Sequence, residues 1–333
     1  MLEFVIRRIF YIIPTMFFIS IVSFVIIQLP PGDYLTTMVS TMNAQGDEVD
    51  PQLLEYLETR YGLNQPVHVQ YFKWMAGIIT QGDFGTSFEW NRPVSTLMWD
   101  RIGLTFVISL TTLLFTWIVA FPVGIYSAVR KYTIGDYILT TIGFVGLAIP
   151  NFLLALVLMY ASYRVFNQSV GGLFSPEYVD APWSWGRFMD LLAHLWIPVV
   201  IIGTAGTAGL IRIMRANLMD ELKKPYVEAA RLKGQKEWLV IVKYPVRVAL
   251  NPFISTVGWL LPTLVSGSAI VAIVLNLPTS GPLLLRALRS QDMYLAGSFI
   301  LVLSFLTVIG TLISDVLLAW LDPRVRYGRT GSA

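Results

Sequence analysis

The chain has 333 residues, of which 55% are apolar and only 14% are charged, and its mean hydropathy is +0.63. A soluble domain usually carries about 25% charged residues, so this composition excludes an ordinary soluble protein. Cysteine is absent, which excludes disulfides, thiol nucleophiles and cysteine-based metal sites. The net charge of +3 says little about partners until its distribution across a membrane is known.

The first long apolar run extends from Ile9 to Leu29 and follows the basic pair Arg7-Arg8. It is long enough to cross the hydrocarbon core of a bilayer, which takes roughly 20 apolar residues. A secretory signal peptide is the alternative. However, the run is long for a signal core, and no small-x-small cleavage site follows it. We therefore expect a retained transmembrane helix over residues 9–29.

A polar segment, residues 31–101, separates this helix from the rest of the chain, which is organised by further uncharged runs. These runs predict spans at Leu104–Val129, Tyr137–Tyr163, Leu195–Ile211, Pro252–Leu275 and Met293–Trp320. Counted from the N-terminal helix, these are the second to sixth spans. Pro150 interrupts the third span, and Pro278 with Gly281 favours a re-entrant or surface loop after the fifth. The sequence therefore predicts an all-α membrane protein with about six transmembrane helices. We expect one domain over residues 1–333, with a five-helix core at 102–330.

The positive-inside rule sets the orientation of these spans. If the N-terminus is cytoplasmic, two thirds of the 24 Lys and Arg residues lie on the inner side, and most of the 21 acidic residues lie on the outer side. Both termini are then cytoplasmic, and residues 31–101 are extracytoplasmic. The segment 212–251, which holds the densest group of basic residues, is cytoplasmic.

Small residues recur inside two of the predicted spans. Gly203, Gly206 and Gly209 lie in the fourth span, where they favour close helix packing. The alternative is that this helix lines a translocation path or a partner interface. Candidate path-lining residues are Ser266, Gly267 and Ser268 in the fifth span and Asn151 beside the Pro150 break. For the serines, packing is favoured over substrate contact because a serine hydroxyl can bond its own helix backbone.

The sequence holds no recognisable catalytic or nucleotide-binding motif. The dipeptide Gly-Lys never occurs, so there is no phosphate loop for ATP, and no metal-spaced histidine cluster is present. We expect both histidines, His68 and His194, at a surface or interface rather than as ligands. Charged residues are nearly absent from the spans, whereas ion-coupled carriers usually place them there. This disfavours a stand-alone channel or secondary carrier. The absence of cysteine, of paired catalytic carboxylates and of a plausible Ser-His pair in facing spans disfavours an intramembrane enzyme still more.

The segment 212–251 is where an energy-supplying partner could act. Its pattern predicts a helix over Leu218–Lys233, with a new helix permitted at Pro225. It also predicts a stop at Gly234 and a second short helix over Gln235–Tyr244. Glu228-Ala229-Ala230 offers one charge beside two small side chains, so a partner's surface could approach closely. An ordinary amphipathic loop on the cytoplasmic side remains the alternative.

The spacing Glu228-Ala229-Ala230-x3-Gly234, followed by a basic and aliphatic stretch ending at Pro252, resembles the EAA signature of ABC importer permeases. Other motifs resemble the B-type subunit of the dipeptide, oligopeptide and nickel branch. They are RRIFYIIPTMFFISIVSFVIIQLPPGD near the N-terminus, YGLNQPVHVQYFKWMAGIITQGDFGTSFEWNRPV in the external segment and LDPRVRYG at the C-terminus. These motifs occur in the family's order from residue 7 to 328.

The resemblance implies the type I permease fold and a place in the cell (inner) membrane. It implies a second, C-type permease subunit, two ATPase subunits and an extracytoplasmic binding protein as partners, with no nucleic acid involved. ATP and Mg²⁺ would bind the ATPases, and this chain would hold no cofactor or metal. Tyr226, Glu228, Ala229, Ala230, Lys233 and Gly234 would form the coupling helix. Glu228 would pair with a basic ATPase residue, the alanines would allow close seating, and Gly234 would make the bend.

The family imports di- and oligopeptides, nickel chelates and, in some members, oligosaccharides. We expect a peptide substrate, with oligosaccharide or nickel chelate as the alternative. The sequence departs from the family pattern at Tyr244-Pro245, where His-Ala is frequent, and in a longer external segment from Met38 to Pro51.

Overall fold

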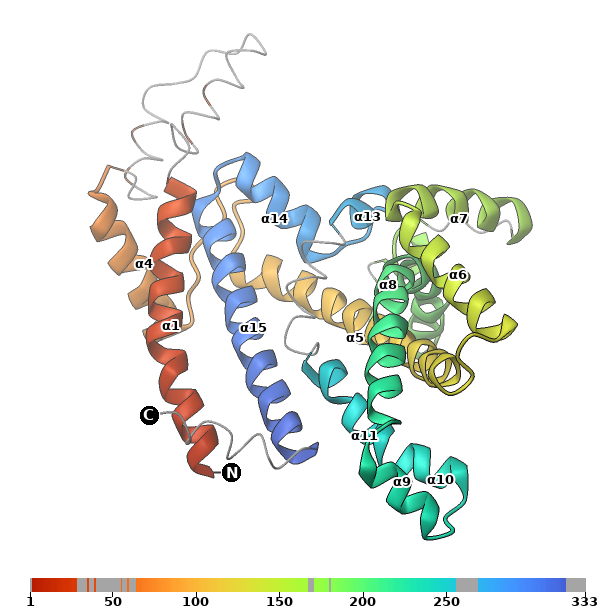
Figure 1. The fold of residues 1–333 in the computed structure, drawn as a ribbon. Helices are drawn as coiled ribbons and strands as arrows, with labels where there is room; N and C mark the ends of the chain where they lie inside the picture. The colour runs from red at the N-terminus through yellow and green to blue at the C-terminus, as the bar shows by residue number, and fades with distance from the viewer. Residues whose placement is uncertain are drawn as a thin grey trace. The chain divides into compact units, whose positions relative to one another are not determined.

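The computed structural model describes residues 2–28, 64–166, 171–179, 181–255 and 269–321, together with the isolated positions 35, 39, 55 and 59. Within these residues the chain is helical and contains no β-strand, and its one isolated β-bridge joins Thr86 to Pro93 (Figure 1). The predicted all-α class is therefore confirmed for the described part of the chain.

The long helices are α1 (Leu2–Gln28), α5 (Val94–Val129), α8 (Trp185–Glu221) and α15 (Met293–Leu321). Between them lie α4 (Val67–Gln81), α6 (Ile134–Ala148), α7 (Asn151–Phe166), a 3-10 turn at Pro176–Tyr178, α9 (Pro225–Leu232), α10 (Glu237–Lys243), α11 (Pro245–Ala249), α13 (Ala269–Val274) and α14 (Ser280–Arg289).

The described helices include three that are long and apolar enough to span a membrane, namely α5, α8 and α15. The pair α6 and α7 makes a fourth if it is one span, but the two helices are bent by 99° at the break. Pro150 explains the break, because proline cannot donate to the helical ladder and disfavours helical geometry in the residue before it. Within α1, Phe10–Val25 is a shorter apolar stretch. Most of the predicted fifth span lies outside the described residues, so the count of six spans stays a prediction.

The chain divides into two compact units. The first, here called the core unit, comprises residues 1–6, 105–278 and 307–333. The second, the N-terminal unit, comprises residues 7–104 and 279–306.

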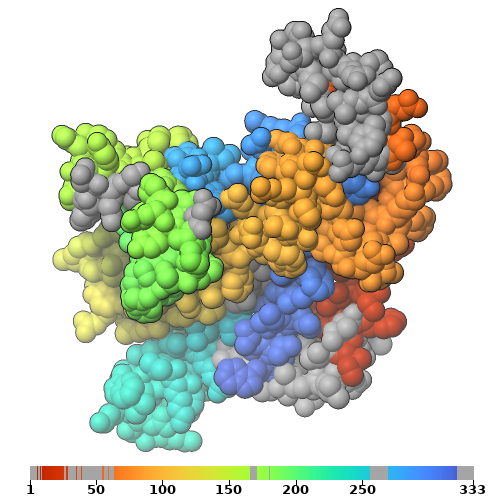
Figure 2. All heavy atoms as spheres, turned by 180° about the vertical axis from the view of Figure 1, so that it is seen from behind, coloured from red at the N-terminus to blue at the C-terminus, as the bar shows by residue number. Residues whose placement is uncertain are grey.

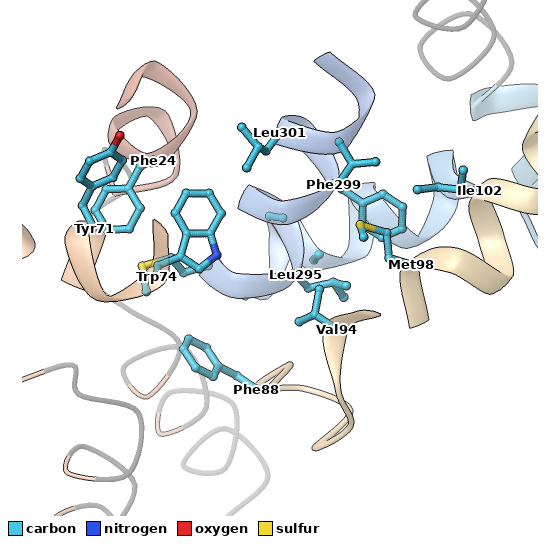
Figure 3. Close-up of a cluster of buried hydrophobic side chains, with 14 residues drawn as sticks. Phe24, Tyr71, Trp74, Phe88, Val94, Met98, Ile102, Leu295, Phe299 and Leu301 are labelled. Atoms are coloured by element: carbon cyan, nitrogen blue, oxygen red, sulfur yellow. The ribbon is translucent and has the colours of Figure 1, made fainter. Parts of the chain in front are cut away.

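Aromatic side chains from α1 and α4 meet inside the N-terminal unit. The Phe24 ring centroid lies 5.4 Å from that of Tyr71 and 5.8 Å from that of Trp74 (Figure 3). Val94 and Phe299, from α5 and α15, are fully buried in the same cluster. The end of the predicted external segment, which includes α4 and the start of α5, therefore belongs to a unit with its own apolar core.

In the core unit, glycines allow α8 to pack closely on its neighbours. A Cβ atom added at Gly203 would lie 2.6 Å from the ring of Phe115 on α5, and one at Gly146 of α6 would lie 2.5 Å from Thr204. Among the described residues, none comes within 4 Å of a Cβ atom added at Gly209. The packing interpretation of the glycines is therefore confirmed for Gly203, and no described neighbour requires glycine at position 209.

The expectation of a surface position is wrong for His194. Its side chain is buried within α8, and Nδ1 lies 2.8 Å from the carbonyl oxygen of Asp190, one turn earlier. A bond to its own helix backbone satisfies this nitrogen, which explains why a histidine can be buried there. His68 is exposed, as expected.

Candidate functional site

The helices α9 and α10 form a helical hairpin, residues 225–243, that follows directly on the end of α8 (Figure 1). α8 ends at Glu221, and Pro225 opens α9 at its first position. Proline suits this position because its fixed φ matches the helix and the first turn needs no backbone donor. The helix predicted over Leu218–Lys233 is therefore broken between Glu221 and Pro225, and the new helix that the sequence permitted at Pro225 is present.

Gly234 makes the turn between the two arms. Its φ is +72°, and its N–H donates to the carbonyl of Arg231 at 2.9 Å. An added Cβ would meet nothing within 4 Å. Glycine is thus favoured here for its left-handed backbone conformation and not for lack of space.

The inside of the hairpin is a small apolar core. Val227 and Ala230 of α9 pack with Val240 of α10, and all three are buried, with Tyr244 half-buried beside them. The sequence motif predicts the same role for Ala229 and Ala230, but the structure separates them. Ala230 packs inside the hairpin and only Ala229 is exposed, because neighbouring residues on a helix point to different faces.

An ion pair joins the two arms beside the turn. Arg231 donates from Nη2 to Oε1 of Glu237 at 2.6 Å and from Nε to Oε2 at 3.1 Å. These hydrogen bonds hold the pKa of the Glu237 carboxyl below its usual value. Both side chains are about half exposed, so we expect the pair to contribute only about 0.2–1 kcal/mol to the stability of the hairpin.

The outer face of the hairpin exposes apolar side chains. Leu232, at the end of α9, is 84% exposed, and Trp238 of α10 is 62% exposed. The hairpin forms a cyan group of exposed atoms in Figure 2. Contiguous exposed apolar patches mark surfaces that bind other proteins, and these two side chains are candidates for such a patch.

The polar members of the predicted motif also lie on exposed positions. Glu228 and Lys233 are exposed, and Glu228 makes no hydrogen bond or ion pair with another described residue. The hydroxyl of Tyr226 donates to Oε2 of Glu221. Burial, and then this hydrogen bond, raise the pKa of Tyr226. Tyr226 therefore ties the start of α9 to the end of α8, while Glu228 is available to a partner.

The base of the hairpin continues into the core unit. Phe253 is fully buried, and its ring centroid lies 4.7 Å from that of Phe121 on α5. Ile241 of α10 belongs to the same cluster, as do Met214 and Leu218 of α8. A force applied to the hairpin would thus reach two long helices through close-packed side chains.

The remaining predicted site residues lie elsewhere. Asn151 is the first residue of α7 and is half-buried. Ser266, Gly267 and Ser268 lie outside the described residues. That these candidate path-lining residues come together therefore stays a prediction.

Two family models match the chain. One, described as the inner membrane component of binding-protein-dependent transport systems, covers residues 120–327, and the model of the corresponding N-terminal region covers residues 1–111. The chain belongs to this family. It is a multi-pass membrane permease, a transport subunit of a binding-protein-dependent importer rather than an enzyme.

Curated relatives align with the permease over nearly its whole length. The oligopeptide transport system permease protein AppB of Bacillus subtilis is 36% identical over 329 residues, covering 98% of this chain and 100% of the relative. The dipeptide transport system permease protein DppB of Alkalihalophilus pseudofirmus is 30% identical over 98% of this chain and 100% of its own length. The glutathione transport system permease protein GsiC of Salmonella paratyphi A is 29% identical over the same shares.

Two apolar residues on the hairpin of this permease were not among the predicted site residues. Leu232 and Trp238 are ordinary members of amphipathic helices in the sequence, and only the fold shows that both are exposed. Their position in the sequence could have indicated them. Leu232 lies just before Gly234 and Trp238 just after it, within a segment rich in charged residues.

Proposed function

We propose that the permease receives the stroke of an ATPase through the hairpin, and that it imports peptides. The observation that carries this proposal is the hairpin's outer face, where Leu232 is 84% exposed at the tip of α9. A side chain of this size gains about 1.5–3 kcal/mol when it is buried, so it favours a partner surface that covers it.

In this proposal two ATPase subunits lie on the cytoplasmic side, and a C-type permease forms the other half of the path. The chain has six spans with both termini cytoplasmic, and a binding protein delivers substrate to the opposite side. Glu228 pairs with a basic residue of the ATPase, and Ala229 allows close approach. The Arg231–Glu237 pair keeps the two arms together, so the hairpin moves as one body.

The peptide substrate is proposed from relatives. AppB and DppB are named as oligopeptide and dipeptide permeases, and GsiC as a glutathione permease, whose substrate is itself a small peptide. Oligosaccharides and nickel chelates remain the alternatives. A binding protein encoded beside this chain, purified and analysed by mass spectrometry, should carry a peptide. A bound oligosaccharide or nickel chelate would overturn the substrate class and leave the coupling proposal intact.

Coupling is tested by Gly234→Pro and Glu228→Lys in the complete importer, reconstituted in vesicles. Proline cannot adopt the φ of +72° and removes the N–H that bonds Arg231. Lysine reverses the exposed charge of Glu228. We expect ATP-driven uptake to fall at least tenfold in both variants while the complex still assembles in the membrane.

The matched control for the charge reversal is Asp220→Lys, because Asp220 is 75% exposed and lies on α8 rather than on the hairpin. Its uptake should stay near the unsubstituted level. Normal uptake in Glu228→Lys and Gly234→Pro would overturn the coupling proposal. Uptake by the purified chain without any ATPase would overturn the proposal of an ATP-driven importer.

A further inference from the structure

A cavity in the core unit lies between α6 and α8 and combines an apolar groove with basic side chains. It has a volume of about 280 Å³. Its apolar wall includes Gly143 and Phe144 of α6 and Ala208 and Ile211 of α8, and its polar residues include Arg212 and Arg215. The groove is therefore apolar along both helices and basic towards the end of α8 that leads into the hairpin.

The basic residues lie where uncharged spans end. Along α6 and α7 no charged residue occurs between Asp136 and Arg164, and along α8 none occurs between Asp190 and Arg212. Since the uncharged stretches occupy the hydrocarbon core, the charged rim of the cavity is placed at the level of the lipid headgroups.

The charges around the cavity leave a net positive rim. Arg215 donates from Nε to Oδ1 of Asp136 at 3.1 Å and from Nη2 to Oδ2 at 2.8 Å, so the two formal charges offset each other. Nη1 of Arg215 takes part in neither bond. Arg212 has no carboxylate partner among the described residues, and its guanidinium lies 5.1 Å from the ring centroid of Phe144. No carboxylate in the described part of the chain therefore offsets its charge at the edge of the apolar groove.

We propose that this cavity binds an anionic phospholipid. One acyl chain would occupy the groove beside Gly143 and Ala208, and the phosphate would meet Arg212 and the remaining N–H groups of Arg215. Basic pockets between transmembrane helices at the cytoplasmic level are a known way to bind anionic headgroups. A zwitterionic lipid carries the same phosphate but adds a cation of its own, so it would not offset the net positive charge of the rim, and free phosphate would not fill the apolar groove. The lipid would fasten α6 to the end of α8 from which the hairpin starts.

The test uses the complete importer in mild detergent and counts bound lipids by native mass spectrometry. The probes are phosphatidylglycerol, phosphatidylcholine of the same chain lengths, and inorganic phosphate. We expect tighter binding of phosphatidylglycerol, without displacement by millimolar inorganic phosphate. Arg212→Gln should weaken phosphatidylglycerol binding about fivefold, the effect of one basic residue at an anionic surface, and leave phosphatidylcholine unchanged.

A second variant tests the groove itself. An added Cβ at Gly143 would lie 3.8 Å from Ala208, an ordinary contact, so Gly143→Leu can extend into the groove without a clash at its first carbon. It should weaken the binding of both lipids. Arg247→Gln is the matched control, because Arg247 is exposed on α11 and does not line the cavity; it should change neither.

Three results would overturn the proposal. The first is equal phosphatidylglycerol binding in Arg212→Gln and Arg247→Gln. The second is displacement of the lipid by inorganic phosphate, which would assign the basic rim to a free anion. The third is loss of the second permease chain from the complex in Gly143→Leu, which would make the groove a subunit interface.

Discussion

The hydroxyl of Ser87 donates a 2.5 Å hydrogen bond to Oδ2 of Asp292, and both side chains are fully buried. The other carboxylate oxygen, Oδ1, accepts from the backbone N–H of Leu295 at 3.1 Å, which caps the start of α15. Oδ2 also accepts from the N–H of Glu89 at 3.3 Å. One carboxylate thus fastens the loop before α5 to a helix that starts more than 200 residues later in the chain.

Replacing Asp292 by alanine should destabilise the N-terminal unit by about 2–4 kcal/mol. The loss combines a helix cap with a buried hydroxyl and a backbone N–H left without an acceptor. Thermal unfolding of the purified permease, followed by tryptophan fluorescence, measures the change. Asp220→Ala, at an exposed position, should shift the midpoint very little. An equal shift in both variants would contradict the role given to Asp292.

The stability of the permease should also depend on pH through Asp292. Burial raises the pKa of this carboxyl above 3.8, so the folded chain binds the proton more tightly than the unfolded chain does. The contribution of Asp292 to stability is therefore greatest below pH 3.8 and falls as pH rises through the raised pKa. The unfolding midpoint of the unsubstituted protein minus that of Asp292→Asn should follow this course. A difference that rises with pH would show that the carboxyl is instead favoured as the anion.

Much of the hairpin could be predicted from the sequence. Pro225 is a local signal for a helix start and Gly234 for a helix stop. In the structure α9 begins at Pro225 and ends at Leu232, just before the turn at Gly234. The exposed positions of Leu232 and Ala229 could not be predicted in the same way, because they depend on where the second arm packs. Local pattern determines an element, and tertiary packing determines which of its faces is free.

Contacts between distant segments could not be predicted from the sequence either, because they too depend on tertiary packing. Nothing in the sequence near Ser87 indicates that its partner is Asp292. Likewise, nothing near Asp136 in the first turn of α6 indicates that Arg215 donates hydrogen bonds to it. The break at Pro150 was predictable as a break, but its 99° bend was not. Proline removes a hydrogen bond in the helix, and the surrounding packing then decides the angle.

The two alanines of the hairpin should respond differently to the same substitution. Ala230→Leu overfills the core beside Val227 and Val240, both fully buried, and should destabilise the hairpin by about 1–3 kcal/mol. Ala229→Leu adds a side chain on the exposed face and should leave the hairpin folded while hindering the approach of a partner. Limited proteolysis near Gly234 should therefore increase in Ala230→Leu only. Vesicle uptake should fall in both variants, and normal uptake in Ala229→Leu would contradict its place at the contact.

The glycines of α8 provide a test of packing inside the membrane. Gly203→Ala places a Cβ atom 2.6 Å from the Phe115 ring, so either α5 or α8 must shift, at a cost of about 1–3 kcal/mol. Gly209→Ala makes the same chemical change on the same helix, yet no described neighbour lies within 4 Å of its new Cβ. Alanine also favours helix over glycine by about 1 kcal/mol in water, so Gly209→Ala should be neutral or slightly stabilising. The unfolding midpoint of the complex in detergent distinguishes the two variants. A loss of stability in Gly209→Ala as large as in Gly203→Ala would show that helix packing against α5 is not what requires glycine at position 203.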